Sequence, residues 1–277
     1  MKVTDFKGRL AYITGGSSGI GLATARLLAA KGASVIIFSR NEDMLKHALE
    51  DINKCRILPN QRFAYIQMDV GNRETCEREL TKTVNEFGQP DILINSAGIS
   101  YPRKFGEIPY QIFDDIIKVN LYGTWNTIDI LLPSLKQEKG YIVNISSIAG
   151  LIGIFAMTAY SASKYAVIGF SEALRSELKP HGVNVAVLCP PDVNTPLMQK
   201  ADKIKPEEAK AISASAHIMT AEEVAAALVR ALGRDDFMII PNTSGKFIHI
   251  AKRFFPGLTE RVIDRTIRKA QLKGLKS

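Results

Sequence analysis

The chain has 277 residues, 46% hydrophobic and 23% charged, which suits one large domain or two small ones and excludes a disordered or collagen-like chain. No apolar run predicts a cleaved secretory signal or a membrane-spanning helix. The net charge is +8, but residues 246–277 hold nine basic and two acidic residues and carry +7 of it. A body close to neutral argues against nucleic-acid binding and leaves the charge to a basic tail.

Short apolar runs of strand length alternate with longer segments of helical periodicity along the chain. Continuous apolar strands that alternate with helices predict an α/β fold, a doubly wound parallel sheet covered on both faces. We expect a single Rossmann-type domain over residues 1–244, with a helical segment near 196–216 covering the substrate, and a basic amphipathic tail over 245–277. Strands are expected at 10–14, 35–38, 63–68, 92–95, 141–145, 183–188 and 237–240, and helices at 19–31, 43–53, 73–87, 110–135 and 159–179.

Three cysteines, Cys55, Cys76 and Cys189, are odd in number and lack the spacing of a metal site or a disulfide framework. We therefore expect no metal site and a reduced, cytoplasmic setting.

A glycine-rich turn follows the first expected strand and opens the first expected helix. Gly15 permits a tight turn, Gly19 removes a side chain where a phosphate approaches, and Gly21 lets helix and strand pack closely. An ordinary strand-to-helix loop is the alternative, but the place at the first strand of an alternating pattern favours a dinucleotide site. The other candidate cofactor-binding residues of this turn are Ser17, Ser18 and Ile20.

The end of the second strand distinguishes between nicotinamide cofactors. A carboxylate there would bind the ribose 2′-hydroxyl of NAD, whereas the Arg that follows Ser39 suits a 2′-phosphate, so Arg40 favours NADPH. A solvated arginine is the alternative. Asp69 and Val70, after the third strand, are expected beside the adenine, although Asp69 could be only a loop cap.

Tyr160 and Lys164 are four residues apart and share one face of an expected helix. A free tyrosine has a pKa near ~10, and a neighbouring cation stabilises the phenolate. Ser147, just past the strand at 141–145, is placed to bind a substrate carbonyl. Such a pair alone is usually a surface feature, but combined with the glycine turn and this serine it predicts acid-base chemistry on a carbonyl.

These motifs resemble those of the short-chain dehydrogenase/reductase family over roughly residues 5–240. Ser96 stands where the family usually has a second Asn, which alters local hydrogen bonding. The pattern consists of Thr14 to Gly21, Asn95-Ser96-Ala97-Gly98, Asn120, Ser147 and Tyr160 to Lys164, in that order.

The resemblance implies a role for each matching residue. Tyr160 would donate a proton to the developing alkoxide, Ser147 would orient the carbonyl, and Lys164 would bind the nicotinamide ribose and favour the tyrosinate. Asn120 would support Lys164 through a water molecule. Members are commonly dimers or tetramers through the helices that hold Asn120 and Tyr160, so a homodimer or homotetramer is expected. Further cofactor contacts implied are Asn95, Ala97, Gly98, Pro190, Val193 and Thr195.

Within the family, the chain resembles the 3-ketodihydrosphingosine reductases, which use NADPH. The run Pro190-Pro191-Asp192 is the telling feature, because most members have Pro-Gly there. Val193-Asn194 replaces the Thr-Asp of that subgroup, Met44 replaces a lysine that often helps hold the cofactor phosphate, and the long hydrophobic segments of animal members are missing. These departures indicate a soluble or peripheral relative.

Two apolar segments bear on the substrate and on partners. Residues 151–157 are apolar without interruption and suit a bulky apolar ketone, or else pack against a neighbouring helix or subunit. The tail interleaves apolar and basic residues and is split by Pro256-Gly257 into two expected short helices. Such a tail lies on an anionic membrane surface, or alternatively packs on the sheet or a partner subunit.

We therefore expect NADPH-dependent reduction of a long-chain 3-keto lipid such as 3-ketodihydrosphingosine in the cytoplasm, with the protein either free there or peripheral to a membrane through its tail. The alternatives are a reductase of a steroid, 3-ketoacyl or xenobiotic ketone on the same frame, and a nucleotide-sensing protein without turnover. The intact set of Ser147, Tyr160 and Lys164 weighs against the last of these.

Overall fold

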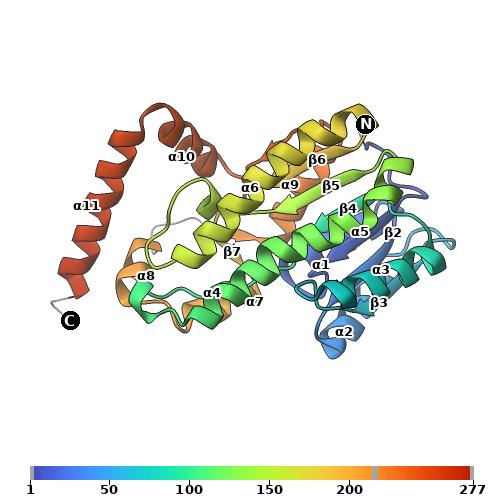
Figure 1. Ribbon diagram of the computed structural model, residues 1–277, viewed down its shortest axis with the longest axis horizontal. Helices are drawn as coiled ribbons and strands as arrows, with labels where there is room; N and C mark the ends of the chain where they lie inside the picture. Colours follow the sequence, from blue (N-terminus) through green and yellow to red (C-terminus); the bar gives the residue numbers. More distant parts are fainter. Residues whose placement is uncertain (1–2, 214–217, 275–277) are drawn as a thin grey trace.

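The computed structural model describes residues 3–213 and 218–274 and shows a parallel sheet with helices on both faces (Figure 1). The strand order is β3-β2-β1-β4-β5-β6-β9, and every pairing is parallel. The order reverses between β1 and β4, which is where sheets of this kind bind ligands beyond their carboxyl ends. The strands are β1 (Leu10–Thr14), β2 (Ser34–Ser39), β3 (Phe63–Gln67), β4 (Ile92–Asn95), β5 (Tyr141–Ile145), β6 (Asn184–Leu188) and β9 (Met238–Ile239).

Two helical layers enclose the sheet. One core cluster lies under α1 (Gly19–Ala29), α2 (Glu42–Asn53) and α9 (Ala221–Leu232). A second lies on the opposite face, under α3 (Arg73–Phe87), α5 (Gly123–Gln137) and α6 (Thr158–Leu178). The predicted doubly wound α/β fold is confirmed.

The alternation of side chains along β1 explains the two cores. Ala11 and Ile13 belong to the first cluster, whereas Leu10 and Tyr12 belong to the second. Successive side chains of a strand point to opposite faces, so a central strand must be apolar throughout. The Tyr12 hydroxyl satisfies its polarity between two carbonyl oxygens, since its single proton can be donated to Gly88 (2.7 Å) or shared with Thr83 (3.1 Å).

Three features differ from the expected elements. The single helix expected over 110–135 is interrupted, since a π-helical turn, η2 (Lys118–Tyr122), separates α4 (Tyr110–Ile117) from α5. Helix α9 was not expected at all. Neither was a two-stranded parallel sheet of β7 (Val193–Asn194) and β8 (Met219–Thr220). Short 3-10 turns are η1 (Phe105–Glu107), η3 (Ile148–Gly150) and η4 (Lys179–His181).

The segment expected to cover the substrate, 196–216, contains α7 (Pro196–Asp202) and α8 (Glu207–Ser213), and residues 214–216 lie outside the described part. The tail forms α10 (Thr243–Phe254) and α11 (Pro256–Gly274). The split at Pro256 was expected, but α11 is 19 residues long rather than short. Figure 1 shows α11 beside α8, at the end of the molecule away from α2 and β3.

Within the residues that the structure describes, no helix combines the length and the hydropathy needed to cross a membrane. All three cysteines are free thiols.

Candidate active site

Ser147, Tyr160 and Lys164 come together at the carboxyl end of β5. Ser147 caps η3, where its Oγ accepts a hydrogen bond from the Ala149 backbone N–H (3.1 Å). The Ser147 hydroxyl is also close enough to the Tyr160 phenol to lower its pKa. The Lys164 Nζ lies 5.6 Å from the centroid of the Tyr160 ring. A hydroxyl, a phenol and an ammonium thus share one end of the sheet.

Lys164 is a buried cation, only 5% exposed. Its Nζ donates a hydrogen bond to the carbonyl oxygen of Ile145, at 2.8 Å. Burial disfavours the charged form of an amine and lowers the pKa of Lys164 to about 8. The ammonium is therefore still largely protonated at neutral pH, but its charge is poorly solvated.

The pKa of Tyr160 is raised, although the cationic neighbour was expected to lower it. Burial raises this pKa to about 12, with Ser147 lowering it through a hydrogen bond and Asp192 raising it through its charge. Burial outweighs the other two because a phenolate loses its hydration. At neutral pH Tyr160 keeps its proton, which is the form that can donate one to an alkoxide.

Asn120 is buried within η2 and binds the backbone rather than Lys164. Its Oδ1 accepts from the Ile99 N–H (2.8 Å), and its Nδ2 donates to the Ile99 carbonyl (3.0 Å) and to Ser163 Oγ (2.9 Å). A Cβ built on Gly98 would lie 3.4 Å from Asn120 Oδ1 and 3.6 Å from Lys164 Nζ. Asn120 therefore fixes the loop after β4 beside α6, and any link to Lys164 through water remains a prediction.

Sequence reasoning missed three residues that fix the first turns of α6. Ser146 Oγ donates to the Lys164 carbonyl (2.8 Å), and Ser163 Oγ donates to the Tyr160 carbonyl (2.7 Å). A Cβ on Gly150 would come within 2.6 Å of the Lys164 carbonyl oxygen, so only glycine fits there. The sequence does hold a signal for them, because Ser146 and Ser163 directly precede Ser147 and Lys164. Gly150 lies three residues after Ser147.

A chain of buried polar side chains crosses the sheet behind the site. Thr127 Oγ1 donates to Asn95 Oδ1 (2.7 Å), Asn95 Nδ2 donates to Asn144 Oδ1 (2.9 Å), and Asn144 Nδ2 donates to Ser171 Oγ (2.9 Å). The chain joins α5, β4, β5 and α6. The side chain of Asn95, an expected cofactor contact, is thus engaged inside the protein.

The glycine turn packs against the loop that follows β4. Gly15 has a φ of +64°, and a Cβ there would lie 2.7 Å from the Ala97 nitrogen. A Cβ on Gly21 would lie 2.4 Å from the Gly15 carbonyl oxygen, so helix and turn can approach this closely only because residue 21 is glycine. Gly19 has a φ of +54° and makes room for Thr195, whose Cγ2 would be 3.0 Å from a Cβ.

The N-terminus of α1 has no side-chain cap, a feature it shares with α4 and α6. Ser18, its N-cap residue, makes no side-chain cap hydrogen bond, and the first turn has no acidic residue. Unpaired N–H groups and the positive end of the helix dipole make this end a fitting site for the pyrophosphate of a dinucleotide. By contrast α2, α3, α7, α9 and α10 are capped by Asn41, Asn72, Thr195, Thr220 and Asn242.

The residues expected at the adenosine end lie at the edges of β2 and β3. Ser17 Oγ donates to Ser39 Oγ (2.9 Å). Arg40 is exposed, with its Nη1 3.9 Å from Asp69 Oδ2. Val70 is only 5% exposed, and its side chain faces the Gly123 position in the core. Arg40 and Asp69 therefore present side chains to a ligand at this edge, whereas the Val70 side chain is buried and its carbonyl oxygen accepts a hydrogen bond from Asn126 Nδ2 (2.9 Å).

The loop after β6 contacts both the turn after Ser147 and the glycine turn before α1. The Pro190 carbonyl accepts from the Ile148 N–H (2.9 Å), which ties this loop to the residue after Ser147. Val193 is buried in β7. Thr195 caps α7 by accepting from Met198 N–H (3.3 Å), so its hydroxyl is already engaged.

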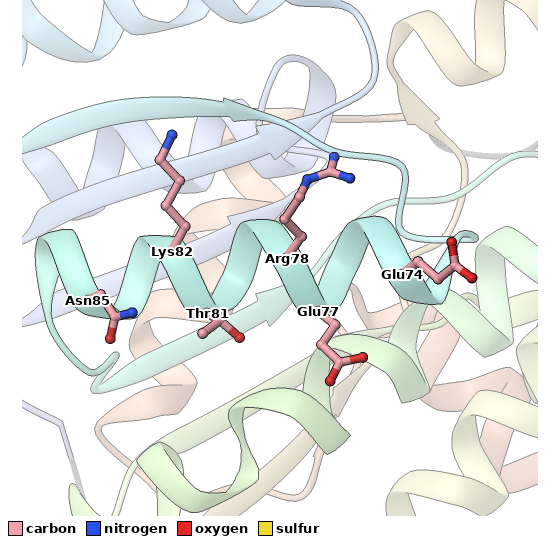
Figure 2. A pocket seen from close by; sticks show the side chains of 6 residues that line it. All are labelled: Glu74, Glu77, Arg78, Thr81, Lys82 and Asn85. Carbon is pink, nitrogen blue, oxygen red and sulfur yellow. The ribbon is translucent and has the colours of Figure 1, made fainter.

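A surface depression elsewhere contributes nothing to this site. Figure 2 shows that the side chains lining it all project from one helix, α3, and none is a site residue. In the described ranges, no group of three or more His, Cys, Asp or Glu side chains could hold a metal ion. The lining residues are Glu74, Glu77, Arg78, Thr81, Lys82 and Asn85.

Comparisons with known proteins agree with this geometry. A family model described as short chain dehydrogenase matches residues 9–206. The 3-ketodihydrosphingosine reductase of Mus musculus is 36% identical over 244 residues, which cover 84% of this chain and 74% of that protein. Levodione reductase has a similar structure, with a TM-score of 0.76 at 27% identity, over 85% of this chain and 96% of that chain. An alcohol dehydrogenase from the archaeon Thermococcus sibiricus, complexed with 5-hydroxy-NADP, matches with a TM-score of 0.72 at 26% identity. The match covers 84% of this chain and 95% of that chain.

Proposed function

The chain belongs to the short chain dehydrogenase family, and we propose that it is an NADPH-dependent reductase of a long-chain 3-keto lipid of the 3-ketodihydrosphingosine type. The observation that carries this proposal is the cluster of Ser147, Tyr160 and Lys164 at the same sheet edge as the uncapped start of α1. The product would be the corresponding secondary alcohol.

Each side chain of the cluster has a distinct task. A reduced nicotinamide bound at this edge supplies a hydride to the carbonyl carbon. Ser147 holds the carbonyl oxygen where negative charge develops. Tyr160, protonated at neutral pH because burial raises its pKa to about 12, gives its proton to that oxygen. The Lys164 ammonium, close to the ring, stabilises the tyrosinate that remains.

The preference for NADPH over NADH rests on Arg40. Its side chain is exposed and has one carboxylate, that of Asp69, at 3.9 Å, so its guanidinium is available to a 2′-phosphate.

Replacing this arginine with a carboxylate tests that preference. Because a charge-assisted hydrogen bond is lost and a repulsion gained, Arg40→Glu should weaken NADPH binding by roughly 10- to 100-fold while sparing NADH. Fluorescence titration of both nucleotides measures this. Equal losses for the two would contradict the role given to Arg40.

The proposed substrate class rests on the relative described above and on the apolar segment after Ser147. Ile152 of that segment is buried in the core, and Ile154 packs against the same cluster. Leu151 packs against that cluster as well, which leaves the half-buried Phe155 and Met157 as the apolar side chains of this segment that would meet a substrate. A steroid or a shorter ketone on the same frame is the second candidate, and the assay below separates the two.

The first experiment follows NADPH oxidation with 3-ketodihydrosphingosine in mixed micelles. Tyr160→Phe removes the proton donor and should lower turnover by roughly 10²- to 10⁴-fold, with NADPH binding retained. Turnover of only a smaller ketone would keep the reductase and reject the sphingoid substrate. No turnover of any ketone, with NADPH bound, would favour a nucleotide sensor.

We further propose a cytoplasmic homodimer or homotetramer assembled through α5 and α6. These helices expose aromatic side chains, since Trp125 is 53% exposed and Tyr165 is 43% exposed, and the Trp125 ring lies 5.6 Å from that of Phe170. Analytical ultracentrifugation should give a species of two or four chains. A monomer at micromolar concentration would contradict this.

A further inference from the structure

Helix α11 has two unlike sides. The side toward α8, against which α11 packs, carries Thr259, Ile263, Ile267 and Ala270, which are half-buried or buried. At about 100° per residue the opposite side gathers a mainly basic and apolar set, with the exposed Asp264 at its border beside Arg261 and Arg268. That set, all exposed, is Leu258, Arg261, Val262, Arg265, Arg268, Lys269 and Leu272.

Helix α10 also leaves an apolar stripe in solvent. Phe247, Ile250 and Phe254 follow one another at helical spacing and are 71%, 52% and 66% exposed. Lys246 and Arg253 are exposed along one flank of this stripe. Large aromatic side chains so exposed on a helix bordered by cations are typical of segments that lie in the headgroup region of a bilayer.

The cations of the two helices are largely unneutralised. Among the described residues, the ion pair found within α10 and α11 joins Lys252 to Glu260 (2.7 Å) and lies at the turn between the helices. That pair and the hydrogen bond from the Thr259 N–H to the Phe255 carbonyl (3.0 Å) fix the turn. The outward cations of α11 are therefore available to an anionic partner.

The position of this surface connects it to the site. Helix α8 packs on α11, and Glu208 of α8 forms an ion pair with Lys104 (2.7 Å), just before η1. The loop that holds Lys104 follows β4 and Gly98, and α8 follows β7, so both come from the edge of the sheet that carries the site.

We propose that this surface, here called the tail face and made of the exposed sets of α10 and α11 given above, docks on an anionic lipid bilayer. A bilayer fits better than a second copy of the chain, because pairing two tail faces would bring like charges together. Aromatic rings enter the headgroup layer while the arginines and lysines pair with lipid phosphates. Uptake of a lipid ketone from that bilayer rests on the proposed function, but the docking does not.

Vesicle flotation of the full-length protein tests the docking without any turnover. The protein should float with phosphatidylcholine vesicles that contain roughly 30 mol% phosphatidylserine and remain below with pure phosphatidylcholine. Arg265→Gln with Lys269→Gln should lower the partition coefficient by roughly 30-fold, since each cation near an anionic surface contributes about fivefold. Lys31→Gln with Lys82→Gln removes the same charge elsewhere and should not change flotation by more than about twofold.

The apolar part of the tail face has its own test. Phe247→Ser with Phe254→Ser should also reduce flotation at least tenfold, with an unchanged circular dichroism spectrum and melting temperature, because both rings are exposed. Equal flotation with charged and uncharged vesicles, or equal loss in the Lys31 and Lys82 control, would overturn the proposal. So would tail variants that change only the sedimentation coefficient, since the occupant would then be a second copy. If the ketone assay fails but the protein still floats with anionic vesicles, the proposed substrate is rejected and the proposed docking stands.

Discussion

At Lys164 and Tyr160, one environment acts on two groups in opposite directions. Burial raises the pKa of the phenol to about 12 and lowers that of the ammonium to about 8. Both shifts move the groups toward their neutral forms, as loss of hydration requires. The site is therefore prepared for proton donation by Tyr160 without ionising it first, while Lys164 is held charged at a cost in stability.

That cost should appear in the pH dependence of unfolding. The unfolded chain keeps the lysine proton up to about pH 10.5, whereas the native protein releases it near the pKa of about 8. The unfolded state thus binds more protons between these values, and the free energy of unfolding rises with pH there. We expect a rise of roughly 3 kcal/mol between pH 8 and 10.5 that is absent in Lys164→Met.

Denaturant unfolding of both proteins across this pH range measures the effect. Taking the difference between them removes the contribution of the buried tyrosines, which have the opposite sign. Parallel curves would show that the Lys164 amine titrates as in water.

The residues of the site differ in how far sequence could predict them. Ser147, Tyr160 and Lys164 lie at recognisable spacings, so their proximity could be predicted. The role of Asn120 depends on the π-helical turn and on the Ile99 backbone, 21 residues away along the chain. Tertiary packing decides such contacts, and no local pattern indicates them.

Among the elements, α1 and its glycine turn are the most tightly constrained. Gly19 has a left-handed φ of +54°, and a Cβ there would lie 3.0 Å from Thr195 Cγ2. A left-handed L-residue costs about 1–2 kcal/mol, before any displacement of Thr195. Gly19→Ala should therefore lower the free energy of unfolding by at least that amount and weaken NADPH binding.

A glycine-to-alanine substitution at an unhindered position serves as the control for Gly19→Ala. A Cβ on Gly153 meets nothing within 4 Å, so Gly153→Ala should leave stability unchanged or slightly higher. Chemical denaturation and NADPH titration of both variants are the measurements. Equal behaviour of the two would refute the strain assigned to Gly19.

The elements themselves were predictable to different degrees. The strands of the large sheet stand out as apolar runs, and their positions agree with prediction to within two residues. Helix α9 was not predicted, although Thr220 and Glu223 form a capping box at its start, a signal present in the sequence. Strands β7 and β8 are two residues each and exist only through pairing across 25 or more positions, so no local signal could reveal them.

On the scale of the whole molecule, the two tail helices are attached differently. Ile248 of α10 packs against the cluster that contains Ile148 and Ile240, and a Cβ on Gly245 would lie 2.9 Å from Ile148 Cδ1. Helix α10 thus supports the turn that follows Ser147. The boundary expected between residues 244 and 245 falls inside α10, which begins at Thr243, and whether the tail is a unit of its own remains a prediction.

Two truncated forms of the chain measure how much α10 and α11 each contribute to stability. Ending the chain after Phe255 removes α11 and its packing on α8, and should leave cooperative unfolding and NADPH binding in place. Ending it after Asn242 also removes Ile248 and should lower the free energy of unfolding by roughly 2–4 kcal/mol. Thermal denaturation of the two forms is the measurement. Equal melting temperatures would show that α10 does not stabilise the body.

The uncapped start of α1 makes the stability of the protein depend on nucleotide supply. Backbone N–H groups of the kind that α2, α3, α7, α9 and α10 cap with a side chain are left here for phosphate oxygens. A nucleotide at about 100 times its dissociation constant adds roughly 2.7 kcal/mol to the stability of the state that binds it. In a cell whose total pool of this nucleotide falls, the amount of folded enzyme would then fall together with its catalytic rate, so the size of one pool would govern both abundance and activity.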